Sequence, residues 1–251
     1  MAKDKTTVGF LIFIIAALSL LVYQNLFLTR NLNKMTSQLD EVQVKFSKLT
    51  DEHTKVLLTL AQVKGAVTVL DSAVNSDTKR RARIAKIRIL IREETAHINT
   101  PEIRELTAAD IADMAVAVVD NSEKYDVPIS LILGVIRQES AFNIKAISNA
   151  GALGLMQLLP STAEDIKIAT GQASYEPFRI SHNIRAGTYY LSKMLHKFGF
   201  DQQKAVWAYN TGPEYVARFV AGEYENLQNQ TIAYEQAVSK HVERFASYGL
   251  K

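Results

Sequence analysis

The first pattern along the chain is a continuous run of apolar positions. Residues 8–28 read VGFLIFIIAALSLLVYQNLFL, which is 21 residues without a charge. A helix of this length rises about 30 Å and can cross the hydrocarbon core of a bilayer. Lys3 and Lys5 would suit the leader of a cleaved signal peptide, which is the alternative, but no small-x-small cleavage site follows the run. We therefore expect a transmembrane anchor over residues 1–29.

A second pattern follows, in which apolar residues recur at alternating intervals of three and four. The thirteen positions of this seam are Leu32, Met35, Leu39, Val42, Phe46, Leu49, His53, Val56, Leu60, Val63, Val67, Leu70 and Val74. The repeat of 3.5 residues is that of a coiled coil, and no proline interrupts it. We expect residues 30–76 to form a self-associating stalk, and valines at d positions favour three or more strands over a parallel dimer. The alternative is one long amphipathic helix packed on its own domain.

A basic segment comes next. Residues 79–92 contain no acid and seven cations, namely Lys79, Arg80, Arg81, Arg83, Lys86, Arg88 and Arg92. Ile84, Ile87 and Ile91 recur at helical spacing, so we expect a helical connector over residues 77–106 with the cations on its flank. Such a run is usually a solvated helix face. The alternative is that it attracts an anionic envelope polymer or lipid head group.

Composition narrows the classes of function. The net charge of +3 results from 29 basic and 26 acidic side chains, so basicity is local and no nucleic-acid partner is expected. Eleven Gly and five Pro favour helices over many short strands. The absence of Cys excludes disulfides, thiolate zinc sites, cysteine nucleophiles and a lipid-modified cysteine.

The C-terminal part contains the candidate chemistry. Thr107 and Asp110 form a capping-box pattern that opens a helix, and Val127-Pro128 separates it from the next, ISLILGVIRQES. Glu139 lies where this apolar helix emerges. Partial desolvation there raises the pKa of a carboxyl, which suits a general acid; the alternative is an ordinary helix-end glutamate in solvent.

Three ordered motifs follow Glu139. The first contains Glu139-Ser140, Ser148, Gly154-Leu155-Met156-Gln157, Pro160 and Thr162-Ala163. The second is residues 183–188, NIRAGT, and the third is residues 208–213, AYNTGP. Together they resemble the catalytic domain of the family-1, Slt-type, lytic transglycosylases. The resemblance implies an all-α, lysozyme-like domain over residues 107–251. One departure is Ala237, which stands where we place the family's C-terminal tyrosine, so the outer sugar subsites are expected to differ.

The resemblance also implies a reaction and a site. The family cleaves peptidoglycan between N-acetylmuramic acid and N-acetylglucosamine by intramolecular transglycosylation and leaves 1,6-anhydromuramoyl ends. By resemblance Glu139 is the catalytic acid, and the expected substrate-binding residues are Ser148, Met156, Gln157, Ala208, Tyr209 and Asn210. No Asp or Glu stands between Glu139 and Glu164, which suits a one-carboxylate mechanism assisted by the substrate's N-acetyl group. Neither a metal nor an organic cofactor is expected.

The implied substrate also determines the expected location. Cations flank the apolar run on both sides, so the positive-inside rule hardly discriminates between orientations. Because peptidoglycan lies outside the cytoplasmic membrane, we expect a single-pass anchor with the catalytic domain periplasmic; a phage virion component is the alternative. The expected partners are glycan strands, the membrane and further copies of the chain. Rival functions are a lysozyme-like hydrolase and a non-catalytic glycan-binding tether.

Overall fold

The computed structural model describes residues 3–250. Within these residues every regular element is an α-helix, and β pairing is limited to two isolated bridges, Ile147 with Leu153 and Leu153 with Leu158. This confirms the predicted all-α class. The chain divides into two compact units, Met1–Ala73 and Val74–Lys251.

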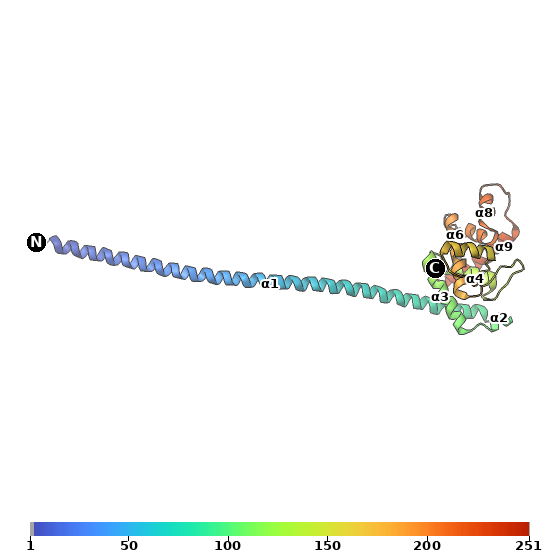
Figure 1. Cartoon of the computed structure of the whole chain (residues 1–251), viewed down its shortest axis with the longest axis horizontal. Helices are drawn as coiled ribbons and strands as arrows, with labels where there is room; N and C mark the ends of the chain where they lie inside the picture. The colour runs from blue at the N-terminus through green and yellow to red at the C-terminus, as the bar shows by residue number, and fades with distance from the viewer. Residues whose placement is uncertain (1–2, 251) are drawn as a thin grey trace. The chain divides into compact units, whose positions relative to one another are not determined.

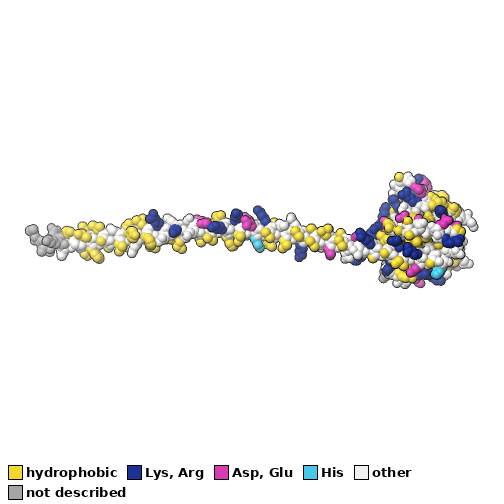
Figure 2. Space-filling model, turned by 90° about the horizontal axis from the view of Figure 1, so that it is seen from below, with side chains coloured by type: hydrophobic (Ala, Val, Ile, Leu, Met, Phe, Trp, Pro, Cys, Tyr) yellow, Lys and Arg dark blue, Asp and Glu magenta, His cyan; other side chains and the backbone are white. Residues whose placement is uncertain are grey.

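Unit 1 is formed by the first part of helix α1 (Lys3–Thr95). No proline occurs before Pro101, so nothing in the backbone interrupts the helix. Every side chain from Thr6 to Ala73 is exposed, and hydrophobic side chains cover the apolar run in Figure 2. The most apolar window of this helix has a mean hydropathy of 2.4, so by length and composition the helix could cross a membrane.

Unit 2 contains the last turns of α1 and eight further helices of the described chain (Figure 1). These helices are α2 (Pro101–Arg104), α3 (Ala108–Tyr125), α4 (Ile129–Ser140), α5 (Pro160–Thr170), α6 (Ile180–Lys197), α7 (Gln202–Thr211), α8 (Pro213–Val220) and α9 (Asn229–Ser247). Helix α3 begins at the predicted capping box: the Thr107 hydroxyl accepts from the Asp110 N–H at 3.1 Å, and the Asp110 carboxylate accepts from the Thr107 N–H at 2.9 Å.

Helix α4 is the central helix of unit 2. Its first eight residues, 129–136, are all buried, and α9 packs along it. The approach is closest at Gly134, where an added Cβ would lie 2.8 Å from Cγ2 of Val242 and 3.3 Å from the carbonyl oxygen of Val238. The absence of a side chain at Gly134 therefore allows the two helices to pack at this distance.

The last turns of α1 belong to the same core. Ile87, Leu90 and Ile91 are buried among the core residues of unit 2. Two cations of the basic run, Arg80 and Arg83, form ion pairs with Asp120 and Glu123 of α3. The connector that the sequence analysis separates from residues 107–251 thus packs within unit 2, and part of its positive charge is paired there.

Candidate active site

Glu139 occupies the last turn of α4, and the backbone immediately turns away. Ala141 and Phe142 adopt left-handed conformations with φ of 50° and 67°, and the Phe142 side chain is fully buried. The buried ring anchors a turn that costs backbone strain. The acid is therefore held at the point where a buried helix reaches the surface, as the sequence analysis predicts.

A cavity of about 500 Å³ opens beside this carboxyl, within the size range of small-molecule sites. Five of the seven predicted site residues line it: Glu139, Ser148, Gln157, Tyr209 and Asn210. They come from α4, from the loop between α4 and α5, and from α7. Tyr190, Thr211 and Gln230 also line the cavity, and sequence reasoning did not assign them to the site.

The other two predicted residues lie elsewhere. The side chains of Met156 and Ala208 are fully buried in the core and do not line the cavity. Met156 fills the space left by Gly187 of α6, where an added Cβ would lie 2.4 Å from the Met156 sulfur. Their contribution to the site is therefore structural: they set the positions of the polar residues beside them.

Tyr234 is the principal contact of the acid. Its hydroxyl donates to Oε1 of Glu139 at 2.6 Å. Burial raises the pKa of Glu139 from 4.5 to about 7, and the bond from Tyr234 opposes that rise by stabilising the carboxylate. Burial also raises the pKa of Tyr234 itself well above 10, so this hydroxyl keeps its proton.

Sequence reasoning missed Tyr234 as a contact of the acid; it noted only that Ala237 stands where the family's C-terminal tyrosine is expected. Tyr234 lies one helical turn earlier on α9 than Ala237 and on nearly the same helix face. The contact with Glu139 lies 95 residues away in the chain, so local spacing gives no signal for it. Ala237 therefore does not leave the acid without a tyrosine.

Tyr209 and Tyr190 form the aromatic side of the cavity. Their ring centroids are 5.4 Å apart in a tilted arrangement. The Tyr209 hydroxyl donates to the Met156 carbonyl oxygen at 2.8 Å, and burial raises the pKa of Tyr209 well above 10. Because this hydroxyl is used within the protein, Tyr209 offers a ligand the face and edge of its ring.

The loop between α4 and α5 supplies the neutral polar groups. Ser148 Oγ accepts from the Ala152 N–H at 3.1 Å, which leaves the hydroxyl hydrogen able to donate to a ligand. Gln157 has a φ of 47°, and its side-chain NH₂ donates to the carbonyl oxygens of Gly154 at 2.8 Å and Ala146 at 3.1 Å. Its side-chain oxygen is then the atom suited to accept from a ligand.

Asn183 of α6 holds this loop in place, a role that sequence reasoning did not assign. Its buried Oδ1 accepts from the Met156 N–H at 2.8 Å, and its Nδ2 donates to the carbonyl oxygen of Leu153 at 3.0 Å. Gly154 passes over this amide with a φ of 77°, and an added Cβ would lie 2.4 Å from Nδ2 of Asn183. Both the left-handed backbone and the close approach therefore require glycine here.

Charge at the site is limited to one group. Among the residues that line the cavity, Glu139 is the sole acid. Over the described part of the chain, no cluster of three or more His, Asp or Glu side chains is arranged to hold a metal ion. The site can thus offer one proton that is exchanged near neutral pH, together with neutral hydrogen-bonding groups and aromatic faces.

Comparison with known proteins places this geometry in context. Residues 117–232 match the family model described as the transglycosylase SLT domain. The membrane-bound lytic murein transglycosylase C of Glaesserella parasuis is 44% identical over 85 residues, which are 31% of this chain and 22% of that protein. The transglycosylase of Enterobacteria phage PRD1 is 35% identical over 91 residues, 36% of this chain and 32% of that protein. The chain thus spans less than a third of the length of these relatives.

A solved structure shares the fold. The 70-kDa soluble lytic transglycosylase, solved in complex with bulgecin A, aligns with a TM-score of 0.51 and 24% sequence identity. The alignment covers 60% of this chain and 26% of that chain. At this identity the likeness shows the arrangement of the helices.

Proposed function

We propose that the chain is a peptidoglycan lytic transglycosylase, because residues 117–232 match the transglycosylase SLT domain model. It cleaves the β-1,4 bond between N-acetylmuramic acid and N-acetylglucosamine and leaves 1,6-anhydromuramoyl ends. The observation that carries the proposal is the single, desolvated carboxyl of Glu139 at the cavity, with its pKa raised to about 7. An acid of this pKa can donate and accept a proton near neutrality.

The reaction uses Glu139 twice. The protonated carboxyl first donates its proton to the glycosidic oxygen, and the bond from C1 of N-acetylmuramic acid to that oxygen breaks. The substrate's own N-acetyl group stabilises the positive charge that develops at C1, in place of a second carboxylate. The resulting Glu139 carboxylate then accepts the proton of the 6-hydroxyl of the same sugar as its oxygen bonds to C1. No water is consumed, and the acid returns to its starting form.

Tyr234 and the loop residues support these two steps. The Tyr234 hydroxyl, 2.6 Å from Oε1, stabilises the carboxylate that forms after the first proton transfer. Ser148 donates to the N-acetyl carbonyl oxygen and Gln157 accepts from a neighbouring group of the sugar. Tyr209 packs against the sugar ring, and Asn210 hydrogen-bonds beside it, since both line the same cavity.

The nearest rival is a hydrolase of the same fold, in which water replaces the 6-hydroxyl. A hydrolase usually needs a second carboxylate to activate that water, and the cavity is lined by Glu139 as its sole acid. A non-catalytic tether, the other rival, has no use for a carboxyl with a raised pKa.

Mass spectrometry of digested peptidoglycan tests the reaction. The wild type should release muropeptides one water lighter than hydrolytic products, and Glu139→Gln should slow release by on the order of a hundredfold or more because it removes the general acid. The isosteric amide preserves the volume of the side chain, and a thermal melt checks that the variant is folded. Reducing ends throughout would favour the hydrolase, and undiminished release by Glu139→Gln would rule out the catalytic role.

The N-terminal part serves as an anchor and stalk in this proposal. Residues 1–29 cross the cytoplasmic membrane once, and the catalytic domain is periplasmic, where its substrate lies. The apolar window of α1 supports the anchor, and the name of the Glaesserella relative records membrane binding for that protein. The alternative location is a phage virion, because one of the relatives is a phage transglycosylase.

Residues 30–76 join further copies of the chain in a coiled coil. The seam residues are exposed in the single chain, with Leu39 at 66% and Leu60 at 62%, so association would bury a continuous apolar stripe. A fragment of residues 30–76 should sediment as a helical oligomer whose melting temperature rises with concentration. A monomeric fragment at high micromolar concentration would contradict this part of the proposal.

A further inference from the structure

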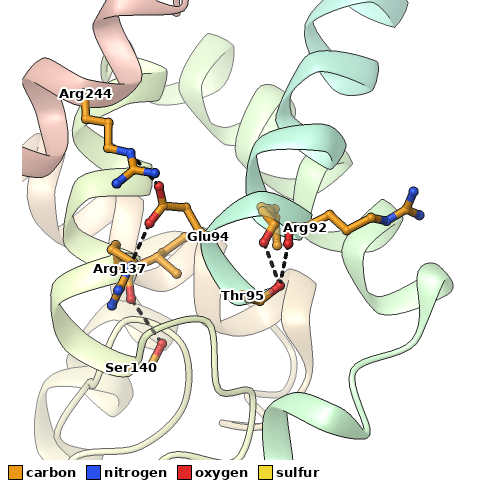
Figure 3. Close-up of polar contacts among 8 residues, drawn as sticks. Arg92, Glu94, Thr95, Arg137, Ser140 and Arg244 are labelled. Carbon is orange, nitrogen blue, oxygen red and sulfur yellow. Dashed lines mark hydrogen bonds and ion pairs between the residues drawn. The ribbon is translucent and has the colours of Figure 1, made fainter. Parts of the chain in front are cut away.

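Glu94 is a buried carboxylate outside the cavity. It lies in the last turns of α1, and 7% of its surface is exposed. Its Oε2 accepts from Nε of Arg137 at 3.1 Å, and its Oε1 pairs with Nε of Arg244 at 2.8 Å (Figure 3). One carboxylate therefore joins α1 to both α4 and α9.

These two helices are the ones that carry the acid and its tyrosine. Arg137 precedes Glu139 by two residues on α4, and Arg244 shares α9 with Tyr234. Glu139 and Tyr234 are 95 positions apart in the chain. Their contact therefore depends on how α4 and α9 are placed along each other. A group that fixes these helices relative to each other also fixes this contact.

Glu94 is itself held firmly. The neighbouring residues Ile87, Leu90 and Ile91 pack in the core, and the Thr95 hydroxyl donates to the Ile91 carbonyl oxygen at 2.7 Å (Figure 3). Removing one partner of a buried ion pair leaves an uncompensated charge and is strongly destabilising. The interaction therefore resists displacement of either arginine.

We propose that Glu94 is a positioning residue for the catalytic pair: its two ion pairs hold α4 and α9 in the register at which the Tyr234 hydroxyl reaches Glu139. The catalytic consequence rests on the function proposed above, while the structural effect does not. Glu94 precedes the matched residues 117–232, so the functional domain begins within α1.

The sign of one measurable effect separates this role from simple electrostatics. Neutralising Glu94 removes a negative charge, which by itself lowers the pKa of Glu139. Loss of the hydrogen bond from Tyr234 instead raises that pKa, because the bond favours the carboxylate. The groups that face Glu94 are Arg137, Arg244 and His241 of α9. Lys240 lies beside His241, and Tyr234 and Tyr209 face Glu139.

Infrared difference spectroscopy of the full chain in detergent can read this pKa directly. The C=O stretch of the protonated Glu139 carboxyl is assigned by its absence in Glu139→Gln and followed against pH. We expect a midpoint of about 7 in the wild type and a higher midpoint in Tyr234→Phe, by up to about one pH unit for one hydrogen bond. Glu94→Gln should raise the midpoint in the same direction, and Glu94→Gln with Tyr234→Phe should raise it no further than Tyr234→Phe alone.

Asp120→Asn is the matched control. It neutralises a carboxylate that also pairs with an arginine of α1, Arg80, but Asp120 lies on α3 and touches neither arginine of the cluster. Its midpoint should stay at the wild-type value. A Glu94→Gln midpoint at or below the wild-type value, or a shift that adds in full to that of Tyr234→Phe, would overturn the proposal.

Arg244→Gln covers the case in which Glu94→Gln does not fold. This arginine is half exposed, and its loss leaves the pair between Glu94 and Arg137 in place. Removal of its positive charge raises the midpoint in any background, so the comparison with Tyr234→Phe decides: a smaller shift from Arg244→Gln in Tyr234→Phe than in the wild type supports positioning, and an equal shift in both contradicts it. Because the spectrum reports protonation and not turnover, a wild type that leaves peptidoglycan intact would refute the proposed function without affecting this test.

Discussion

Unit 1 and unit 2 are built from the same secondary structure under opposite conditions of burial. From Thr6 to Ala73 every side chain of unit 1 is exposed, so its helix rests on local hydrogen bonds and on the absence of helix-breaking proline. In unit 2 the helices are shorter and are held together by a core that runs from Ile87 to Leu250.

The difference determines where chemistry is possible. On the exposed helix of unit 1 a side chain has neighbours three and four positions away and remains in contact with solvent. In unit 2, burial brings Glu139 against Tyr234 and raises the pKa of the acid to about 7. A proton donor for neutral pH requires this desolvated setting, which a single exposed helix cannot provide.

Paired leucine substitutions give the largest expected contrast between the units. Leu131→Ala in α4 removes a fully buried side chain and should lower the free energy of unfolding of unit 2 by about 2–5 kcal/mol, independently of protein concentration. Leu60→Ala in the seam should leave this transition unchanged and weaken association of the stalk. Denaturant melts at several concentrations measure both effects.

The pair of Leu131→Ala and Leu60→Ala can also contradict the difference between the two units. Equal destabilisation of unit 2 by the two substitutions would contradict the assignment of Leu60, which is 62% exposed, to a seam that is independent of the core of unit 2. If the melting of the wild-type stalk does not depend on protein concentration, unit 1 does not form a coiled coil with further copies of the chain.

The raised pKa of Glu139 predicts a pH-dependent stability of unit 2. Between the ordinary pKa of 4.5 and the native value of about 7, the native state binds more protons than the unfolded state. Stability therefore falls as pH rises through this window, by about 3 kcal/mol in total. Glu139→Gln lacks this titration. Its free energy of unfolding relative to that of the wild type should therefore rise by about 3 kcal/mol between pH 4 and pH 8.

Urea denaturation at several pH values measures this difference. Glu214→Gln is a suitable control, because this glutamate is largely exposed in its pair with Lys197 and should not reproduce the effect. A constant difference between Glu139→Gln and the wild type across pH would indicate that Glu139 titrates at its ordinary value.

Local patterns in the sequence were sufficient to predict part of this structure. The 3.5-residue repeat predicted helix across the stalk, the capping box predicted the start of α3, and the apolar run before Glu139 predicted a buried helix with the acid at its end. Each of these features depends on residues within about two turns of one another, so spacing alone reports them.

Long-range contacts were beyond such reasoning. Tyr234 lies 95 residues from Glu139, and the spacing of residues within α9 does not indicate that it reaches the acid. In the sequence Glu94 is one of two adjacent acids after a basic run, and its burial between two arginines depends on the packing of three helices. Met156 belongs to a recognisable motif, yet only the fold shows that its side chain fills the core beside Gly187.

The smallest expected effect concerns Ser148, whose hydroxyl supplies one neutral hydrogen bond to the substrate in the proposed mechanism. Such a bond contributes about 0.5–1.5 kcal/mol net, so Ser148→Ala should slow turnover about two- to twelve-fold, well short of the loss in Glu139→Gln. Initial rates of muropeptide release measure the effect.

Ser72→Ala is the same chemical change in unit 1, where the hydroxyl donates to the Val69 carbonyl oxygen at 2.8 Å, and it should leave the rate unchanged. The Ala152 N–H loses its acceptor in Ser148→Ala, so equal melting temperatures are needed for the comparison. A folded Ser148→Ala as inactive as Glu139→Gln would contradict the supporting role assigned to Ser148.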